Sequence, residues 1–270
     1  MRKTLTIALT AATIAVAAQS NAQANGTLYF SQDGNGNGLY SINYNTGVAT
    51  NVGLSGVTSS TVGLTEGPNP SQLLGSSWTD LNAINTDGSG TTTLGAVFAE
   101  GLAYHAANGL LYGILNGAFF SANAGTGALI ANLATPMDPA GNVLDLEGLA
   151  SAHGMIFGIG GFADSNTDLW AYNIGTDTWS SVGNTGIDWS LSGLAYDPIG
   201  DWLYGIGDQD NNLYRINPFN GATSIVGATG IQGTTGGGLG FVVAPVPEPA
   251  TMAVLAMGAL AMLRRRKSSK

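Results

Sequence analysis

One short pattern recurs five times along this chain of 270 residues, and it constrains the fold more than any other feature. Each copy has Leu or Phe first, usually an aromatic residue second, an apolar residue fourth and asparagine fifth. The copies occupy residues 39–43, 81–85, 119–123, 169–173 and 213–217. A turn with Gly, Asp or Thr follows each copy, and the period is roughly 45 residues. Self-similarity at such a period indicates a repeat architecture.

Two further apolar segments precede the pattern in a typical repeat. The first is Gly-Leu-Ala, at 101–103, 148–150 and 193–195, with a degenerate copy at 63–64. The second resembles Leu-Tyr-Gly-Ile, and its copies begin at Leu28, Leu73, Leu111, Ile156 and Leu203. With the short strand that follows the turn, a repeat has four strands. Four short strands in about 45 residues are typical of one blade of a β-propeller, so the sequence predicts an all-β fold.

The ends of the repeat region predict how the ring closes. The first repeat lacks its Gly-Leu-Ala strand, and a matching segment stands at the other end, at residues 238–243. Pairing of the two ends would remove free sheet edges, which promote aggregation. We therefore expect a five-bladed β-propeller closed by a C-terminal strand. An open β-solenoid and a pair of β-sandwiches are the alternatives.

Composition excludes several functions for the body, residues 25–245. The chain has 8 Lys and Arg residues, and only Arg215 lies in the body. Of its 17 Asp and Glu residues, all except Glu248 lie there, so the body has 15 net negative charges. Nucleic-acid binders neutralise phosphates with Lys and Arg, so we expect no nucleic-acid partner. The chain has no cysteine, which excludes disulfides and a thiol nucleophile.

The N-terminus has the three parts of a secretory signal peptide. Residues 1–3 are basic after the initiator Met, residues 5–18 are apolar, and residues 22–24 form a small-x-small cleavage site. This arrangement predicts cleavage after Ala24 and export of the protein. Residues 1–24 therefore stand outside the predicted propeller domain of residues 25–245.

The C-terminus, residues 246–270, has a second tripartite arrangement. Its parts are the turn Val246, Pro247, Glu248 and Pro249, an apolar segment at 250–263, and the basic cluster Arg264, Arg265, Arg266 and Lys267. A stable membrane span needs about 20 apolar residues, so this predicted hydrophobic helix is short for a permanent anchor. The basic cluster would stay on the cytoplasmic side.

This tail resembles the PEP-CTERM sorting signal of Gram-negative bacteria. The resemblance implies an exosortase-type processing enzyme as a partner, and membrane contact of the tail before processing. It also implies a final location at the cell surface or outside the cell, often in bacteria that make extracellular polysaccharide. A plain C-terminal membrane anchor is the alternative.

Three loops between the second and third strands carry Asp or Asn at every other position. They contain Asp33, Asn35 and Asn37; Asp164, Asn166 and Asp168; and Asp208, Asp210 and Asn212. Oxygen ligands at this spacing suit calcium, as in the first half of an EF-hand loop. The closing Glu of such a loop is absent, because Tyr44 stands at that position after Asp33. Asp, Asn and Gly are also common in hairpin turns, so turn formation without metal is the alternative.

Glu100 and Glu147 each stand next to a Gly-Leu-Ala segment, and Glu66 lies near the degenerate copy. If these segments line the central channel, their carboxylates could converge at one mouth and hold a metal or a sugar. Sugar-lactone hydrolases of the gluconolactonase type use an acidic metal site of this kind, which suggests a hydrolase. The alternative is a glutamate at the solvated end of a strand.

No complete catalytic set can be assembled from the sequence. His105 and His153 fall at the turn after the Gly-Leu-Ala segment, where solvated side chains are the common case. Trp78, Trp179 and Trp189 depart from the repeat and leave carbohydrate binding open. We expect an exported binding or structural protein of the cell surface or polysaccharide matrix, and not an enzyme. A metal-dependent hydrolase or lactonase and a calcium-stabilised carbohydrate-binding protein are the alternatives.

Overall fold

A computed structural model gives the structure of the chain and describes residues 25–32, 38–53, 61–160, 167–187, 191–231 and 236–244. The described residues contain 20 β-strands and no helix. Residues Gly26–Val243 form one compact unit. In the part of the chain that is described, no helix is long and apolar enough to cross a membrane.

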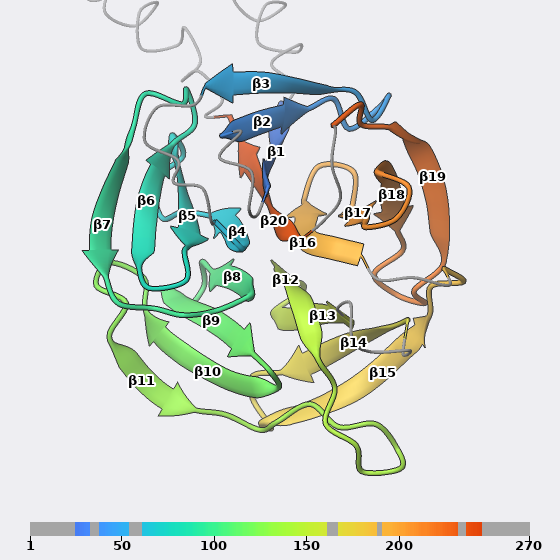
Figure 1. The fold of residues 1–270 in the computed structure, drawn as a ribbon. Coiled ribbons are helices and arrows are strands. Elements are labelled where there is room, and N and C mark those ends of the chain that lie inside the picture. The colour runs from blue at the N-terminus through green and yellow to red at the C-terminus, as the bar shows by residue number, and fades with distance from the viewer. Residues whose placement is uncertain are drawn as a thin grey trace, which may run out of the picture. The chain divides into compact units, whose positions relative to one another are not determined.

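The strands form five sheets of four strands, each ordered from the centre of the ring to its edge (Figure 1). The first contains β20 (Gly237–Val243), β1 (Gly26–Gln32), β2 (Leu39–Ile42) and β3 (Ala49–Gly53). The second contains β4 (Gly63–Glu66), β5 (Gln72–Ser76), β6 (Leu81–Asn85) and β7 (Thr91–Gly95). The third contains β8 (Gly101–His105), β9 (Leu110–Leu115), β10 (Ala118–Asn123) and β11 (Leu129–Asn132).

The two remaining sheets complete the ring. The fourth contains β12 (Leu146–Ala152), β13 (Met155–Gly160), β14 (Asp168–Asn173) and β15 (Thr178–Asn184). The fifth contains β16 (Leu191–Asp197), β17 (Trp202–Gly207), β18 (Asn212–Ile216) and β19 (Thr223–Ala228). The innermost strands are therefore β4, β8, β12, β16 and β20. The predicted five-bladed β-propeller is confirmed, and the solenoid and sandwich alternatives are wrong.

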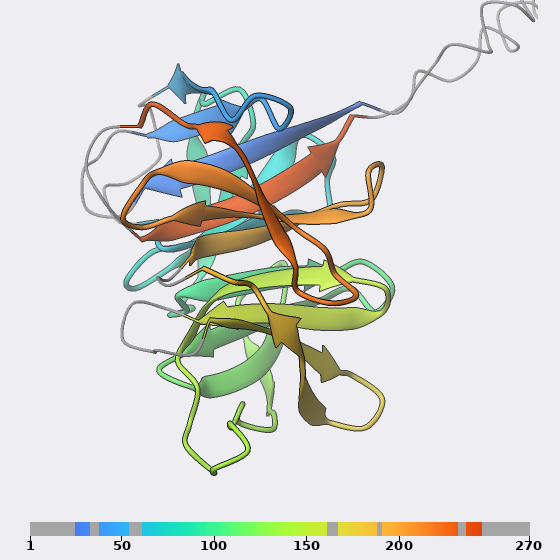
Figure 2. The ribbon, with the colours of Figure 1, turned by 90° about the vertical axis from the view of Figure 1, so that its right-hand side faces the viewer.

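The predicted closure by a C-terminal strand is also confirmed. β20 pairs antiparallel with β1 over seven residue pairs, from Gly26 opposite Val243 to Gln32 opposite Gly237. The red β20 lies beside the blue β1 in the rotated view as well (Figure 2). The first blade therefore takes its inner strand from the far end of the body, which joins the two ends of the repeat region.

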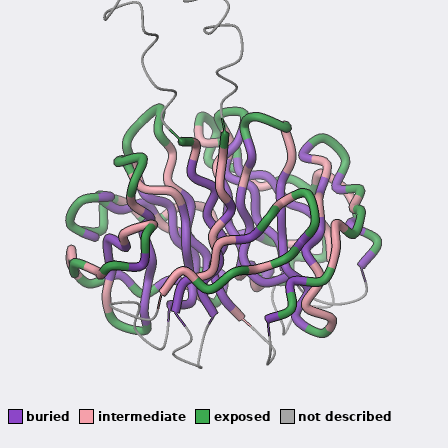
Figure 3. The backbone as a smooth tube through the Cα atoms, turned by 90° about the horizontal axis from the view of Figure 1, so that it is seen from above, coloured by how far each residue is buried: buried purple, intermediate pink, exposed green. Residues whose placement is uncertain are grey.

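The core is divided among the interfaces between blades. Five clusters of buried apolar side chains each draw residues from two neighbouring blades, as when Leu64 and Leu73 pack with Leu39 and Val242. Buried positions gather in the strands and exposed ones at the turns and the outer edge (Figure 3). Burial of this apolar surface stabilises the ring without any disulfide.

The recurring asparagine of the sequence pattern has a local cause. Its side-chain oxygen accepts the backbone N–H of the residue two positions later, at 3.0 Å for Asn43, 2.9 Å for Asn123 and Asn173, and 2.8 Å for Asn217. Such Asx turns start the hairpin between the third and fourth strands of a blade. The pattern therefore encodes a strand end and its turn.

The glycine of the Gly-Leu-Ala segments lies where inner strands approach one another closely. A Cβ atom on Gly101 would be 2.9 Å from the carbonyl oxygen of Glu147 in the next blade. A Cβ on Gly63 would meet the carbonyl oxygen of Glu100 at the same distance. Real Cβ contacts are not this short, so side chains larger than hydrogen would push the inner strands apart.

Candidate functional site

A cavity of about 390 Å³ lies at the mouth of the channel where the inner strands end. All five blades contribute to its wall through the last residues of their inner strands. These are Glu66 from β4, Tyr104 and His105 from β8, Ser151 from β12, Tyr196 from β16 and Val243 from β20. The turns that follow these strands complete the wall. Because every blade takes part, the cavity depends on closure of the ring.

Among the described residues, Glu66 is the only acidic one in the cavity wall. The hydroxyl of Thr65 donates to Glu66 Oε2 at 2.9 Å, and Thr65 Oγ1 accepts the backbone N–H of Tyr104 at 3.1 Å. This chain of hydrogen bonds joins the blade of β4 to the blade of β8. Loss of contact with water disfavours the charged carboxylate and raises the pKa of Glu66 to about 7. Glu66 can therefore exchange a proton near neutral pH.

His105 and Ser151 form a second contact between blades inside the cavity. Nδ1 of His105 lies 2.8 Å from Oγ of Ser151. Removal from water lowers the pKa of His105, which keeps the imidazole neutral at pH 7 and able to accept a hydrogen bond. Such a pair can bind a ligand hydroxyl.

Nucleophilic catalysis by Ser151 would need a further group that orients His105. Among the described residues, no ion pair or hydrogen bond joins a carboxylate to His105. Its ring instead meets the ring of Tyr112 edge-on, with 6.4 Å between the centroids.

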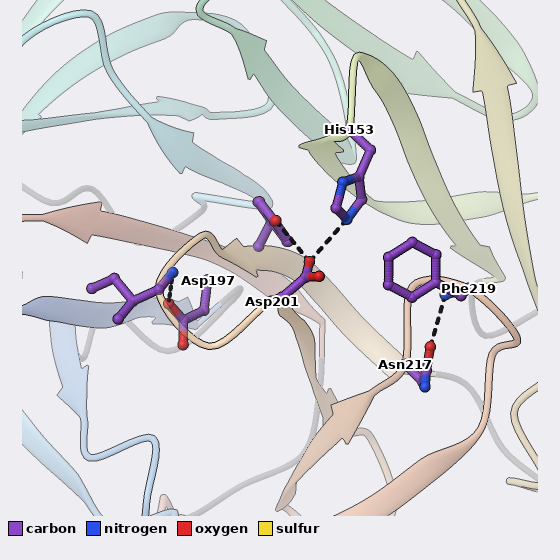
Figure 4. Close-up of polar contacts among 7 residues, drawn as sticks. His153, Asp197, Asp201, Asn217 and Phe219 are labelled. Carbon is purple, nitrogen blue, oxygen red and sulfur yellow. Dashed lines mark hydrogen bonds and ion pairs between the residues drawn. The ribbon is translucent and has the colours of Figure 1, made fainter.

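His153 belongs to the cavity wall, and we call His153 with the two residues it contacts, Asp201 and Phe219, the rim. Figure 4 shows these three residues. Nε2 of His153 lies 2.9 Å from Oδ1 of Asp201, and the hydroxyl of Tyr196 donates to the same oxygen at 2.8 Å. The ring of Phe219, which is 67% exposed, lies 5.0 Å from the ring of His153. An exposed aromatic ring beside hydrogen-bonding groups offers a ligand both a stacking surface and polar contacts.

The tyrosine of this rim stays protonated. Removal from water, together with the hydrogen bond to Asp201, raises the pKa of Tyr196 to about 12. Tyr196 is therefore a hydrogen-bond donor across the physiological pH range, with Asp201 as its acceptor.

Four residues of the predicted calcium loops are described, namely Asp168 of the second loop and Asp208, Asp210 and Asn212 of the third. Asp168 Oδ1 accepts the side-chain amide of Asn184 at 2.9 Å, and Asp208 accepts the hydroxyl of Ser192. Asp210 accepts the backbone N–H of Asn212 at 3.0 Å, which is the geometry of a hairpin turn.

Asp210 also accepts the hydroxyl of Tyr214 at 2.6 Å. In the described parts of the chain, no three His, Cys, Asp or Glu side chains are grouped so that they could hold a metal ion. The remaining predicted ligands, Asp33, Asn35, Asn37, Asp164 and Asn166, lie outside the described residues. Calcium binding stays a prediction.

Glu100 and Glu147 stand at equivalent places on adjacent blades. Glu100 precedes β8, and Glu147 is the second residue of β12, so both lie where the inner strands begin. Glu66 is the last residue of β4 and lies at the opposite mouth. The expectation that the three carboxylates share one mouth is therefore wrong for Glu66, because β4 runs from Gly63 toward the other mouth.

The tryptophans outside the repeat pattern have different environments. Trp179 is partly buried against the core and donates its Nε1–H to the carbonyl of Ala134 at 2.9 Å. Trp78 is 46% exposed, and its ring lies 5.1 Å from that of Phe98. Trp189 lies outside the described residues. Of the two that are described, Trp78 is the one whose exposure suits ligand stacking.

Sequence reasoning did not find the cavity contacts of His105 and His153, because it placed both residues in solvated turns. His105 is the last residue of β8 and only partly exposed, and His153 pairs with Asp201. The repeat does contain a signal for the contact between His105 and Ser151. Ser151 follows His105 by 46 residues, about one blade, so the two come from neighbouring inner strands.

Among the solved structures reported below, the first has a TM-score above 0.5 and supports the fold. The chain is similar to a chain of a nidogen/laminin complex, with 10% sequence identity, a TM-score of 0.54, and coverage of 81% of this chain and 98% of that one. A glutaminyl cyclase of Myxococcus xanthus gives 17% identity, a TM-score of 0.46, and coverage of 62% and 68%. A hydrazine synthase of Kuenenia stuttgartiensis gives 14% identity and a TM-score of 0.43 over 61% of this chain and 49% of that one.

No curated protein sequence matches the chain. Residues 245–267 match the family model of the PEP-CTERM protein-sorting motif. The predicted sorting residues at 246–249 and 264–267 fall within this match, although they lie outside the described residues. Such a motif indicates export to the cell envelope of a Gram-negative bacterium and processing by an exosortase-type enzyme. The chain therefore carries a PEP-CTERM sorting motif after a five-bladed β-propeller body.

Proposed function

We propose that the protein is an exported binding module of the cell surface or extracellular matrix, and that its ligand occupies the cavity at the channel mouth. The observation that carries this proposal is the cavity itself, to which all five inner strands contribute. Concave sites with a few convergent polar groups are where proteins bind small ligands. The sorting motif supports this location, because it indicates export to the cell envelope.

Carbohydrate is the ligand class that the wall and rim favour. Tyr104, Tyr196 and the exposed Phe219 are aromatic, and Ser151 and the neutral His105 can exchange hydrogen bonds with hydroxyl groups. A protein of a polysaccharide-producing cell surface would meet such ligands there.

The test is a glycan-binding screen of the full chain with and without a filled cavity. Ala106 is exposed and belongs to the cavity wall, so Ala106→Trp should fill the cavity without disturbing the core. Ala140→Trp is the matched control, because Ala140 is exposed in the loop between β11 and β12 and is not part of the wall. We expect the first variant to lose binding and the second to keep it. Equal binding by both would place the ligand elsewhere.

A metal-dependent hydrolase or lactonase at the opposite mouth is the second candidate. It is supported by the equivalent positions of Glu100 and Glu147 on neighbouring blades. Two carboxylates on one channel entrance could share a metal that activates water. Hydrolysis of sugar lactones that requires added metal, and that is lost in Glu100→Gln and Glu147→Gln, would establish it. Activity that persists in either variant would exclude this site.

A further inference from the structure

The body of the protein provides almost no positive charge of its own. Arg215 is its only Lys or Arg, and the guanidinium of Arg215 lies 4.3 Å from the centre of the Trp202 ring. Neither residue belongs to the cavity wall. Any permanent cation that meets the acidic groups of the body must therefore come from another molecule or from the ends of the chain.

The cavity contains one of these acidic groups in an unusual setting. Glu66 is the last residue of β4 and belongs to the cavity wall. The hydroxyl of Thr65, a neutral donor, donates a hydrogen bond to its carboxylate. A carboxylate that is partly removed from water gains strongly from an opposite charge at short range. The wall offers no Lys or Arg to supply that charge.

The remainder of the wall suits an organic cation better than a hydrated metal ion. Tyr104, His105 and Tyr196 are aromatic residues of the cavity wall, and all three are partly exposed. The negative faces of aromatic rings attract ammonium groups, and aromatic cages recognise quaternary ammonium ligands in this way. Metal ions instead require several oxygen ligands, and the wall has a single carboxylate.

We propose that the cavity binds an organic ammonium group, with the carboxylate of Glu66 as its counter-ion and the aromatic wall around it. This inference rests on the proposed function and narrows its ligand class. The source of the ammonium group is either a free small molecule or an amino group on a polysaccharide.

The affinity for such a cation should rise with pH. Glu66 ionises around pH 7 and is the charged partner only above that value. The other titratable groups facing the cavity are Tyr104 and His105 from β8, His153 after β12, and Tyr196 from β16. The segments of β20 and of the turn after β4 in the wall contribute none. Protonated histidines would also repel a cation at low pH. A variant of Glu66 must therefore separate the effect of its ionisation on the affinity from the effect of the histidines.

The experiment compares choline with its neutral carbon isostere dimethylbutanol, by calorimetric titration of the full chain. The two ligands share one shape, and the charge of choline does not depend on pH. Glu66→Gln keeps the size and the acceptor for Thr65. Asp87→Asn is the matched control, because Asp87 is exposed in the turn after β6 and is not part of the wall.

We expect choline to bind about tenfold more tightly than the isostere above pH 7, and Glu66→Gln to remove most of this preference and its pH dependence. Asp87→Asn should change neither. Binding of choline and the isostere with equal affinity, a preference that persists in Glu66→Gln, or the failure of both choline and the glucosamine oligomer to bind would each overturn the inference. The variant Ala106→Trp tests the proposed function separately, because the binding of neutral glycans can be measured with it even if no ammonium ligand binds.

Oligomers of glucosamine and of N-acetylglucosamine distinguish the two sources. Binding of the glucosamine oligomer that depends on Glu66 would assign the site to a polysaccharide amine. Binding of choline alone would assign it to a free small cation. Either result supports the ammonium site.

Discussion

Nδ1 of His105 lies 2.8 Å from Oγ of Ser151, which is 46 residues further along the chain and one blade further around the ring. The contact joins β8 to β12 at the cavity, next to the hydrogen bond from Tyr104 to Thr65 that joins β8 to β4. Polar contacts between blades thus hold the mouth of the channel in addition to the apolar interfaces.

Ser151→Ala should lower the free energy of unfolding by about 1 kcal/mol, because a partly buried hydrogen bond between blades is lost. Urea denaturation measures this change. The control is Ser41→Ala, whose hydroxyl makes a long and exposed contact of 3.4 Å with the carbonyl of Thr50. If both variants lose the same small amount, the His105–Ser151 contact does not hold the blades together.

The ionisation of Glu66 predicts a pH dependence of stability. Its pKa is about 7 in the folded chain against 4.5 for the ordinary group, so the folded state binds the proton more tightly than the unfolded state. The resulting stabilisation is fully present below pH 4.5 and is lost as the pH rises toward 7.

Denaturation at pH values below and above this range, with the native chain and with Glu66→Gln, isolates this contribution. The native chain should lose more than about 1 kcal/mol relative to the variant on going to the higher pH. His105 acts in the opposite direction, since its lowered pKa costs stability as the pH falls through its ordinary value of 6.5. If the difference in unfolding free energy between the native chain and Glu66→Gln is the same at both pH values, the burial of Glu66 is contradicted.

Gly101→Ala should destabilise the ring by about 1–3 kcal/mol, because the added methyl group would overpack the contact between inner strands. Its Cβ would lie 2.9 Å from the carbonyl oxygen of Glu147 and 3.0 Å from Cγ2 of Ile114. Gly125→Ala is the control, since its Cβ would approach nothing nearer than 3.4 Å. If both substitutions lower the melting temperature by the same amount, the close approach of β8 and β12 does not determine the stability of the ring.

Calcium binding by the acidic loops predicts ligand-dependent stability. Millimolar calcium added after chelation should raise the melting temperature, because a ligand of the folded state stabilises it. Asp33→Ala and Asp164→Ala should reduce this rise, and Asp208→Ala should reduce it if the third loop also binds. A melting temperature that does not respond to calcium would leave these loops as hairpin turns.

Much of the fold could be predicted from the sequence because one blade is encoded locally. The recurring Asn marks a hairpin through its own Asx turn, as Asn173 does with Gly175. The glycine of each inner strand marks a close approach, as Gly101 does with Glu147. The displaced strand of residues 238–243 could be recognised as the closing strand because it repeats the same local pattern.

The cavity could not be predicted in the same way, because its residues meet only across blades. Glu66 ends β4 and lies at the mouth opposite to Glu100 and Glu147, which stand where β8 and β12 begin. His153 and Asp201 differ between blades and leave no repeated pattern to align. Contacts such as that of His105 with Ser151 depend on the rotation between neighbouring blades, which the residue order within one blade does not specify.

The most direct measurement is a map of amide chemical shifts in the full chain during titration with choline. If the channel mouth is the binding site, the shifts that change will gather at the ends of the inner strands, around Glu66, His105, Ser151, Tyr196 and Val243. Changes centred instead on the exposed pair Trp78 and Phe98, or on the outer strands, would contradict binding at the channel mouth.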